Sequence, residues 1–541
     1  MFYPAQKTLG YSHALLLYAP FYVPVRAFLH AFQAYSLSLF IIIEVGIVCL
    51  YVIFRRFMHL SFVESLLLTV FFFTSANVIN GTIGVWSQRA SVFLIPPIVL
   101  LALISYHHHP GRRQLVVAAI SGFLATLLFP HDFYSGFFAF FFGAVFLVAW
   151  MLAEGQMSKL TPRFRFDRQH LSERVALGAF VVTAAWAIYL WTSGGVRTRV
   201  FGIRITSQDW RRPTLVALLS VAVFAYIRGS SRLRADFKAA IGGWRTFVGS
   251  WGKATMLGGI LGCAVFLWGY LPAYLEHPQF PERDLLSQIR VRTWHHWSSP
   301  LQDLSAYDTV RSFKLAAILA VLAGLPWIKI DRKIRSFVAW LFVASALVLL
   351  MPLRIDQFAL WLWFLRHIPG FSVIRDPTRV IFEYELAFVI ACGLLLTLLR
   401  QRPVYRACVG LLFAYFLFTD HHVDKLGYER PVETYRRWVQ TPIDVDPACR
   451  SFFIKAASAE YMSRSDNMWA LYGVDSMFIA LQLGIPTLNG YSAWGPAGWD
   501  LMNPPEPPYR ERVTAWIKQN NLQGVCEFDI DARTMSIASI N

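Results

Sequence analysis

The chain is dominated by apolar stretches long enough to form membrane helices, and this feature excludes most other folds. About twelve such stretches recur before residue 420, and a bilayer-spanning helix needs roughly 20 predominantly apolar residues. Charged residues make up 15% of the chain, against about 25% in soluble domains. A soluble globular fold, a disordered chain and a nucleic-acid-binding protein are therefore excluded. The stretches cover residues 34–54, 62–79, 92–106, 115–129, 134–152, 175–191, 215–226, 256–271, 315–328, 337–351, 380–399 and 407–418.

Lys and Arg clusters fall in alternate connections between these stretches. The chain has 50 Lys and Arg against 33 Asp and Glu, and membrane proteins retain such basic loops in the cytoplasm. The alternation predicts a multi-pass protein of the bacterial inner membrane. It also assigns residues 193–212, 273–313, 352–379 and everything after 419 to the outer side. The basic clusters are Arg55–Arg56, Arg112–Arg113, 159–174, 228–253, 329–335 and 400–406.

The composition becomes that of a soluble domain after Thr419. Strand-like runs at 450–454 and 525–530, with helical stretches at 469–483 and 511–520, predict a small α/β domain. The expected fold class is thus an all-α polytopic membrane domain of about twelve helices over residues 1–419, followed by a small extracytoplasmic α/β domain over 420–541.

Two cysteines fall in the predicted outer domain, Cys449 and Cys526, and both flank predicted strands. An oxidising compartment permits a disulfide there, whereas a cytosolic domain would leave two idle thiols. The sequence leaves open whether the two are bridged. No cysteine or histidine spacing indicates a zinc site.

An imidazole and a carboxyl group stand side by side in a very short connection between two spans, at His131 and Asp132. A carboxylate at the outer membrane surface suits a general base, and we take this pair as candidate catalytic residues. An equally good interpretation is that Asp132 caps the helix beginning at Phe133.

A second cluster precedes the stretch at 380–399, where Arg375, Asp376 and Arg379 are followed by Glu383 and Glu385. Guanidinium groups make bidentate, permanently charged contacts, and a lipid phosphate would lie at this height. Arg375 and Arg379 are therefore candidate phosphate ligands. The alternative is a structural network in which they neutralise the two glutamates.

Two aromatic segments of the outer loops suit a sugar. One is WHHW, with Trp294 and His295; the other contains Asn489, Tyr491 and Trp494 among glycines. Aromatic faces match the apolar faces of sugars, and amides supply hydrogen bonds. The alternatives are an interfacial anchor for the first segment and packing onto the membrane helices for the second. A metal at the paired histidines is the weaker interpretation, because no acidic residue stands at a helical ligand spacing.

Two further features lie in or beside the spans. Glu44, in the run FIIIEVGIV, is the clearest charge inside an apolar stretch. Its alternatives are a buried protonated hydrogen-bond donor, a proton relay or a partner for an Arg of another span, and we favour a structural role over a relay. The run FALWLWF at 358–364 is too short to span a bilayer, and its tryptophans predict a helix lying on the membrane surface.

The segments FYPAQKTLGYSHALLLYAP, PGFSVIRDPTRV and PTLNGYSAWGPAGW resemble the GT-C glycosyltransferase superfamily. More narrowly, they resemble its bacterial polytopic members, which are distantly similar to protein mannosyltransferases and aminoarabinose transferases. The resemblance extends over most of the chain. It implies transfer of a sugar from a polyprenyl-phosphate carrier, with a loop carboxylate as base and basic residues holding the carrier phosphate. By position, Arg375 and Arg379 match that basic element.

The chain departs from the superfamily where the principal acid is expected, in the first outer loop. Residues 1–30 contain no Asp or Glu. Three expectations remain: a helix and its acid lie upstream of Met1 in the natural protein, Asp132 substitutes, or the protein is inactive. We favour an upstream helix, because residues 1–30 must lie outside in the predicted topology.

The function expected from these features is transfer of a lipid-linked sugar to an extracytoplasmic acceptor, which is a cell-envelope glycan, a lipid or a protein. Its partners would be the donor and membrane lipids, with no nucleic acid. No cofactor is identified, and a requirement for a divalent metal stays open. The alternatives are a transporter or flippase of a lipid-linked glycan, which needs an internal polar path, and an inactive envelope-assembly protein.

Overall fold

A computed structural model describes most of the apolar helices and most of the C-terminal domain. The described residues are 3–4, 15–75, 78, 87–107, 111–153, 171–193, 196–200, 203–207, 211–229, 249–269, 293, 341–342, 350–355, 358–367, 374, 376–419, 442–455, 468–491, 495–496 and 498–538.

The described chain before residue 420 is mainly helical, and five helices are long and apolar enough to cross a membrane. All but two of the predicted stretches coincide with a helix; those at 315–328 and 337–351 lie wholly or largely outside the described residues. The elements are η2 (Leu16–Tyr18), α1 (Ala19–Arg26), α2 (Ala31–Val52), the π-helical turn η3 (Ile53–Phe57), α3 (Phe62–Phe73), η4 (Ser87–Leu94), α5 (Ile95–His107), α6 (Arg112–His131), α7 (Phe133–Ala153), α9 (Leu171–Ser193), α10 (Arg211–Arg228), a helix at Gly249–Gly269, α16 (Leu360–His367), η6 (Pro377–Arg379), α17 (Val380–Leu398) and α18 (Pro403–Thr419).

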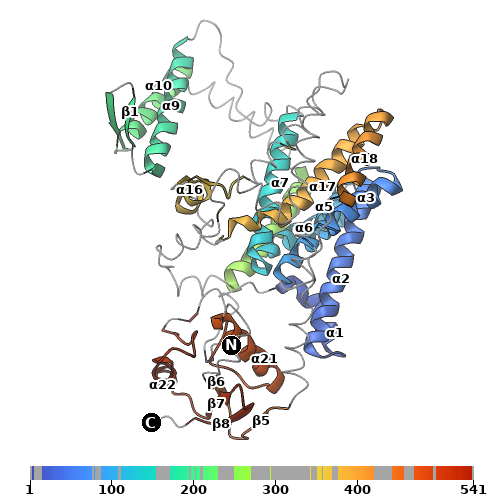
Figure 1. Cartoon of the computed structure of the whole chain (residues 1–541). Helices are drawn as coiled ribbons and strands as arrows, with labels where there is room; N and C mark the ends of the chain where they lie inside the picture. Colours follow the sequence, from blue (N-terminus) through green and yellow to red (C-terminus); the bar gives the residue numbers. More distant parts are fainter. Residues whose placement is uncertain are drawn as a thin grey trace.

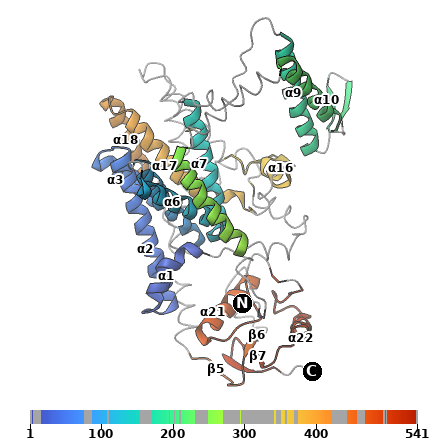
Figure 2. The ribbon, with the colours of Figure 1, turned by 180° about the vertical axis from the view of Figure 1, so that it is seen from behind.

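Helix α17 is the central helix of the bundle. In its most apolar window 83% of the residues are buried, against 17–44% in the other long helices. It contacts α3 and α7 directly, and apart from Glu383 and Glu385 near its start it is mainly apolar on all sides, as expected of a helix enclosed by others. Figure 1 shows α2, α3, α5, α6, α7, α17 and α18 gathered in one bundle. Figure 2 shows α9 and α10 standing apart from that bundle.

The connections meet at two opposite ends of the bundle. At one end the Arg406 guanidinium pairs with Glu64 at the start of α3, and the Thr397 hydroxyl donates to the Met58 carbonyl. At the other end the Leu15 N–H donates to the His131 carbonyl. The helices therefore alternate in direction, as the spacing of the basic clusters predicts.

Glycines allow α6 and the helix at Gly249–Gly269 to touch backbone to backbone. A Cβ added at Gly258 would overlap the Ala119 carbonyl, and one at Gly122 would overlap the Thr255 carbonyl. Gly258 and Gly262 form a G-x-x-x-G spacing, which is typical of helix pairs that pack closely in membranes.

Short strands connect some of the helices. Strands β1 (Val196–Val200) and β2 (Ile203–Ser207) form an antiparallel hairpin between α9 and α10. Strands β3 (Arg354–Ile355) and β4 (Phe358–Ala359) form another just before α16.

The segment at 358–364 is helical from Leu360 onward, as predicted, but one of its two tryptophans does not lie at a surface. Trp361 is fully buried, contacts Phe137 and Phe138 of α7, and donates its indole N–H to the Ile374 carbonyl. A buried indole needs such an acceptor, so Trp361 anchors the chain leading into α17 rather than a lipid interface.

The C-terminal region is a four-stranded sheet with the order β5-β8-β7-β6 and helices on both faces. Phe452, Ile454 and Tyr472 pack on one face, with α21, whereas Phe453, Val513 and Trp516 pack on the other, with α22. Both faces of β6 are therefore buried, which explains its continuous apolar run. The elements are β5 (Asp444–Val445), β6 (Ser451–Ile454), α21 (Met468–Leu483), α22 (Tyr509–Gln519), β7 (Val525–Asp529) and β8 (Thr534–Ile537).

The prediction of a small α/β domain is confirmed, and the structure adds β5 and β8 to the two predicted strands. Strand β8 carries only one fully buried side chain, Met535, so its sequence gives a weak strand pattern.

The sheet joins the bundle through the N-terminal segment and the start of α2. The His30 Nε2 atom lies 3.1 Å from Oε1 of Gln482, and the ring of Phe32 stacks on Phe478. The Tyr3 N–H donates to the Thr487 carbonyl at 3.0 Å. These contacts put the sheet at the bundle end that contains His131.

Cys449 and Cys526 form a disulfide that closes a sequence separation of 77 residues. We expect its loss to destabilise the domain by about 4 kcal/mol, because the bond restricts the unfolded chain and the loop is long. Reduction, or the Cys449→Ser/Cys526→Ser double substitution, should therefore speed proteolysis within residues 442–538.

The measurement is limited proteolysis with peptide mapping, together with mass spectrometry of unreduced peptides to detect the linked pair. Cys408, an exposed thiol in α18, supplies the matched control as Cys408→Ser. Equal cleavage of the wild-type and doubly substituted proteins would contradict the expected stabilisation.

Candidate active site

The junction between α6 and α7 is buried, and Asp132 caps α7 from inside the bundle. Asp132 leaves the helical conformation, which ends α6 at His131 and lets α7 begin at Phe133. Its Oδ2 atom accepts from the Ser135 hydroxyl at 2.7 Å and the Ser135 N–H at 3.3 Å. The side chain is only 3% exposed. The helix-cap alternative therefore describes its local role, and the cap fixes the direction of the carboxyl group.

His131 is fully buried and holds the N-terminal segment in place. The Leu17 N–H donates to Nδ1 at 3.1 Å, while Nε2 lies 3.0 Å from the Ser91 hydroxyl. Because a backbone N–H can only donate, Nδ1 is the acceptor and the ring proton resides on Nε2. The ring also packs edge-on against Tyr18. With both nitrogens engaged, His131 positions its neighbours, and this arrangement gives no support to the predicted catalytic role.

Tyr18 extends this network toward Asp132. Its hydroxyl hydrogen-bonds the Ser91 side chain, and it lies close enough to the Asp132 carboxyl to interact electrostatically. Burial raises the pKa of Tyr18 well above its usual value, so the phenol stays neutral and can donate. A neutral phenol is the group that can lie beside a buried carboxylate without like-charge repulsion.

Arg379 lies in η6, at the entry to α17, and contacts α7. Its Nε atom is 3.4 Å from Oδ2 of Asp376, and its guanidinium carbon lies 4.6 Å from the centre of the Tyr134 ring. The Asp376 N–H donates to the Tyr134 hydroxyl at 3.2 Å. Tyr134 thus binds both partners of the ion pair, one through its face and the other through its oxygen.

Glu383 belongs to the same cluster, although the sequence suggested only a neutralising role for it. It lies one turn after Arg379, hydrogen-bonds the Ser135 side chain, and interacts electrostatically with Asp132 and Arg379. It is 4% exposed. Since Ser135 has a single hydroxyl proton, it can donate to only one of the two carboxyl groups at a time. The spacing of four residues from Arg379 is the signal in the sequence that places Glu383 on the same helix face.

Glu385 lies elsewhere on α17. It is fully buried and interacts electrostatically with Tyr384 and Cys392. A displacement of two residues turns a helical side chain by roughly 200°, which separates Glu385 from the side of α17 that carries Glu383.

The cluster contains three carboxyl groups and one guanidinium among the described residues: Asp132, Asp376, Glu383 and Arg379. These carboxyl groups can exchange protons with one another beside one permanent positive charge.

Four residues with predicted roles lie outside the described residues, so those roles stay predictions: Arg375, Trp294, His295 and Trp494. Within the described chain no group of three or more His, Cys, Asp and Glu side chains could hold a metal ion.

The predicted sugar-binding residues of the C-terminal domain differ in exposure. Asn489 is 1% exposed; its Oδ1 accepts from the Ile454 N–H, and its Nδ2 donates to the Leu501 carbonyl and the Tyr509 hydroxyl. It is therefore a structural amide that joins β6 to α22, and its burial gives no support to a glycan contact. Tyr491 is partly exposed and remains a candidate.

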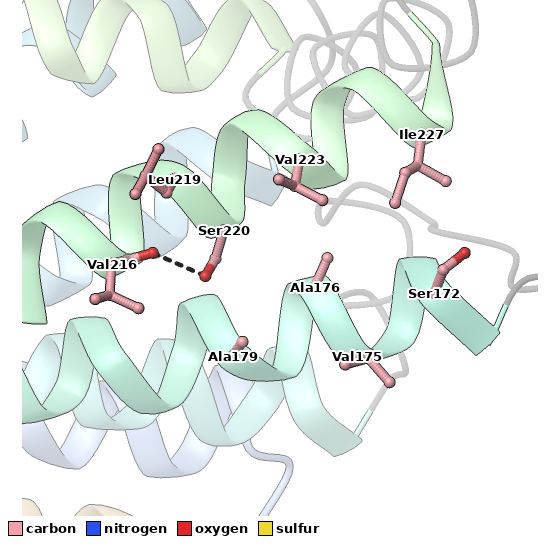
Figure 3. Close-up of a pocket in the computed structure, with 9 residues that line it drawn as sticks. All are labelled: Ser172, Val175, Ala176, Ala179, Val216, Leu219, Ser220, Val223 and Ile227. Carbon is pink, nitrogen blue, oxygen red and sulfur yellow. Dashed lines mark hydrogen bonds between the residues drawn. The ribbon is translucent and has the colours of Figure 1, made fainter.

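An apolar groove of about 540 Å³ separates α9 from α10, away from these groups. Figure 3 shows Ala176, Ala179, Leu219 and Val223 among its lining residues. The Ser220 hydroxyl in the groove donates to the Val216 carbonyl of its own helix. A groove without ionisable groups suits lipid chains, and we place the candidate active site at the Asp132 cluster instead.

Comparisons with protein-family models, with curated proteins and with solved structures give no match for this chain.

We expect His131→Ala to destabilise the bundle by about 1–3 kcal/mol, because the partly buried Leu17 N–H loses its acceptor, while Ser91 keeps its hydrogen bond to Tyr18. The measurement is the apparent melting temperature of the purified protein in detergent. His107→Ala is the matched control, since His107 also ends a helix but is exposed. Equal melting temperatures for the two variants would contradict the positioning role.

Proposed function

We propose that the chain is a multi-pass protein of the bacterial inner membrane, with its C-terminal domain outside the cytoplasm. The five long apolar helices support insertion. Among the described residues, the basic clusters at Arg55–Arg56, Arg112–Arg113 and 400–406 lie at the end of the bundle opposite His131 and support that end as the cytoplasmic one. The disulfide supports an oxidising compartment for the C-terminal domain.

We further propose that this protein transfers a sugar from a polyprenyl-phosphate donor to an acceptor hydroxyl on the outer face. The observation that carries this proposal is the meeting of Asp132 with Arg379, a carboxyl group and a guanidinium from distant connections, around Ser135, Glu383 and Tyr134. The N-terminal segment bound to His131 also contacts the C-terminal domain, so the cluster lies near the side where an outer acceptor would approach.

In the proposed reaction the acceptor oxygen attacks the anomeric carbon of the donor sugar. The bond from that carbon to the phosphate oxygen breaks, and the phosphate leaves with the electron pair. Asp132 takes the hydroxyl proton, and the Ser135 cap keeps its carboxyl group oriented. Arg379 stabilises the charge that develops on the phosphate.

Phosphate binding must overcome the excess of carboxyl groups in the cluster. A guanidinium carries five N–H donors, so Arg379 can contact a phosphate while Nε remains near Asp376. Arg375, four residues before Arg379 in the sequence, is proposed as the second cation. Glu383 is proposed to receive the proton from Asp132 through Ser135 and to give it to the departing phosphate, which leaves both carboxyl groups ionised for the next turnover.

We expect Asp132→Asn to lower kcat about 10²–10⁴-fold, because the amide oxygen still caps α7 but cannot accept the proton. The assay uses the purified full-length protein, radiolabelled polyprenyl-phosphate sugar and a cell-envelope acceptor fraction. Ser135→Ala, which removes the bridging hydroxyl, should give a smaller loss. Transfer at the wild-type rate by Asp132→Asn would exclude Asp132 as the base.

We expect Arg379→Ala to lower kcat/KM for the donor about 10²–10³-fold, because one preorganised charge on the phosphate is lost. Arg379→Lys should recover part of the activity, since it restores the charge without the bidentate geometry. Arg400→Ala is the matched control, at the exposed opposite end of α17. Full activity of Arg379→Ala would remove the phosphate role.

A transporter of a lipid-linked glycan is the second candidate, favoured by the buried Asp132–Glu383 pair, since buried carboxyl pairs also serve as proton relays. Reconstituted vesicles discriminate between the two. Movement of the lipid-linked sugar across the bilayer, with no new glycosidic bond, would favour transport.

A further inference from the structure

Helix α2 carries an ionisable side chain halfway along an otherwise apolar span. With η3 it forms a continuous span of 27 residues, Ala31–Phe57. Glu44 stands 13 residues after Ala31 and 13 before Phe57. In the proposed membrane placement, on which this inference rests, its carboxyl group lies near the middle of the hydrocarbon. Such a group is costly there unless another polar group satisfies it.

The side chain of Glu44 points away from the bundle. Ser38, Ile42 and Gly46 lie on the buried face of α2, where the Gly46 backbone contacts Phe93 of η4. Glu44 is exposed and lies one turn from Phe40 and one turn from Val48, which are 59% and 56% exposed. These positions, four residues apart, form one stripe on the outer face. We call Phe40, Glu44 and Val48 the α2 outer stripe.

Within the described residues Glu44 has no hydrogen bond and no ion pair. The prediction that it pairs with an Arg of another span is therefore not met in that part of the chain. Lipid alone would leave both carboxyl oxygens without a partner.

We propose that the α2 outer stripe is the contact between two copies of this chain, with the two Glu44 side chains hydrogen-bonded to each other. Copies inserted in the same direction are related by a twofold axis normal to the membrane, so every residue lies at the same depth as its counterpart and the residues that face the axis meet it. Glu44 thus faces Glu44, with Phe40 and Val48 packed one turn away on either side.

A second copy satisfies Glu44 better than a basic partner does. A neutral carboxyl group has one O–H donor and an acceptor oxygen, so two such groups satisfy each other. A Lys or Arg partner would bring a second ion to the same depth, where ions are least favourable. The stripe has no pair of small residues for close backbone contact, which leaves the hydrogen bonds to hold the two helices together.

The first experiment measures dimerisation of the full-length protein in lipid vesicles, by energy transfer between labelled copies at increasing dilution in lipid. Wild type should dimerise, and Glu44→Leu should raise the dissociation constant about tenfold, the effect of losing one interhelical hydrogen-bonded pair. Glu44→Gln, which keeps a donor and an acceptor, should stay close to wild type. A monomer at every dilution, or a dimer indifferent to Glu44→Leu, would overturn the proposal.

The second experiment locates the contact by oxidative cross-linking after Cys49, Cys263, Cys392 and Cys408 are changed to Ser. Val48→Cys should give a disulfide-linked dimer. Val182→Cys, at an even more exposed apolar position of α9, should not. Cross-linking at Val182 alone, or capture of a different protein at Val48, would contradict a twofold contact through α2.

The sugar-transfer assay separates this inference from the proposed function. Glu44→Leu should retain transfer activity when it is monomeric, because Glu44 is not part of the Asp132 cluster. If the wild type dimerises and Glu44→Leu weakens the dimer, the contact is supported even when no variant transfers sugar.

Discussion

The contact between Tyr134 and the turn at Asp376–Arg379 connects the two parts of the chain on which the candidate site depends. The hydroxyl of Tyr134 accepts from the Asp376 backbone, and its ring lies under the Arg379 guanidinium. One side chain of α7 thereby fixes where the central helix α17 begins. Because α17 is enclosed by the bundle, this register also determines which of its polar residues face α7.

Burying several polar groups at one end of an apolar bundle is unfavourable unless each is hydrogen-bonded. The structure meets this requirement with groups that serve two neighbours. Ser135 contacts both Asp132 and Glu383, and His131 contacts both Leu17 and Ser91. Such shared contacts make the cluster rigid, and rigid polar groups are what a site for charge development requires. A proton can also pass along them without bulk water.

Much of the architecture follows from the sequence, since it depends on local composition. The apolar stretches predicted α2, α6, α7 and α17 to within a few residues, because a helix in an apolar environment must satisfy its own backbone. Alternation of the basic clusters predicted which helix ends meet.

The sequence predicted only part of the candidate site. Asp132 and Arg379 were identified because charges beside apolar runs are rare. Ser135 was not assigned to the site, since neither its partners nor its burial is visible in a linear sequence. Glu383 was grouped with Arg379 only as a neutralising partner, because its contact with Ser135 of α7 depends on how the helices pack. Asn489 stood out among glycines, but its burial depends on how β6 and α22 pack.

The sequence by itself determined where the described apolar helices lie, the separate C-terminal domain and the residue types that can carry chemistry. These properties depend on whether a segment is more stable in water or in an apolar environment. The amino-acid composition of the segment determines that preference. Only the tertiary structure decided that Cys449 meets Cys526, that His131 holds the N-terminal segment, and that Asp132 and Arg379 share one cluster. Those pairings join residues far apart along the chain. Their geometry is set by how whole helices and sheets pack, and not by any local preference.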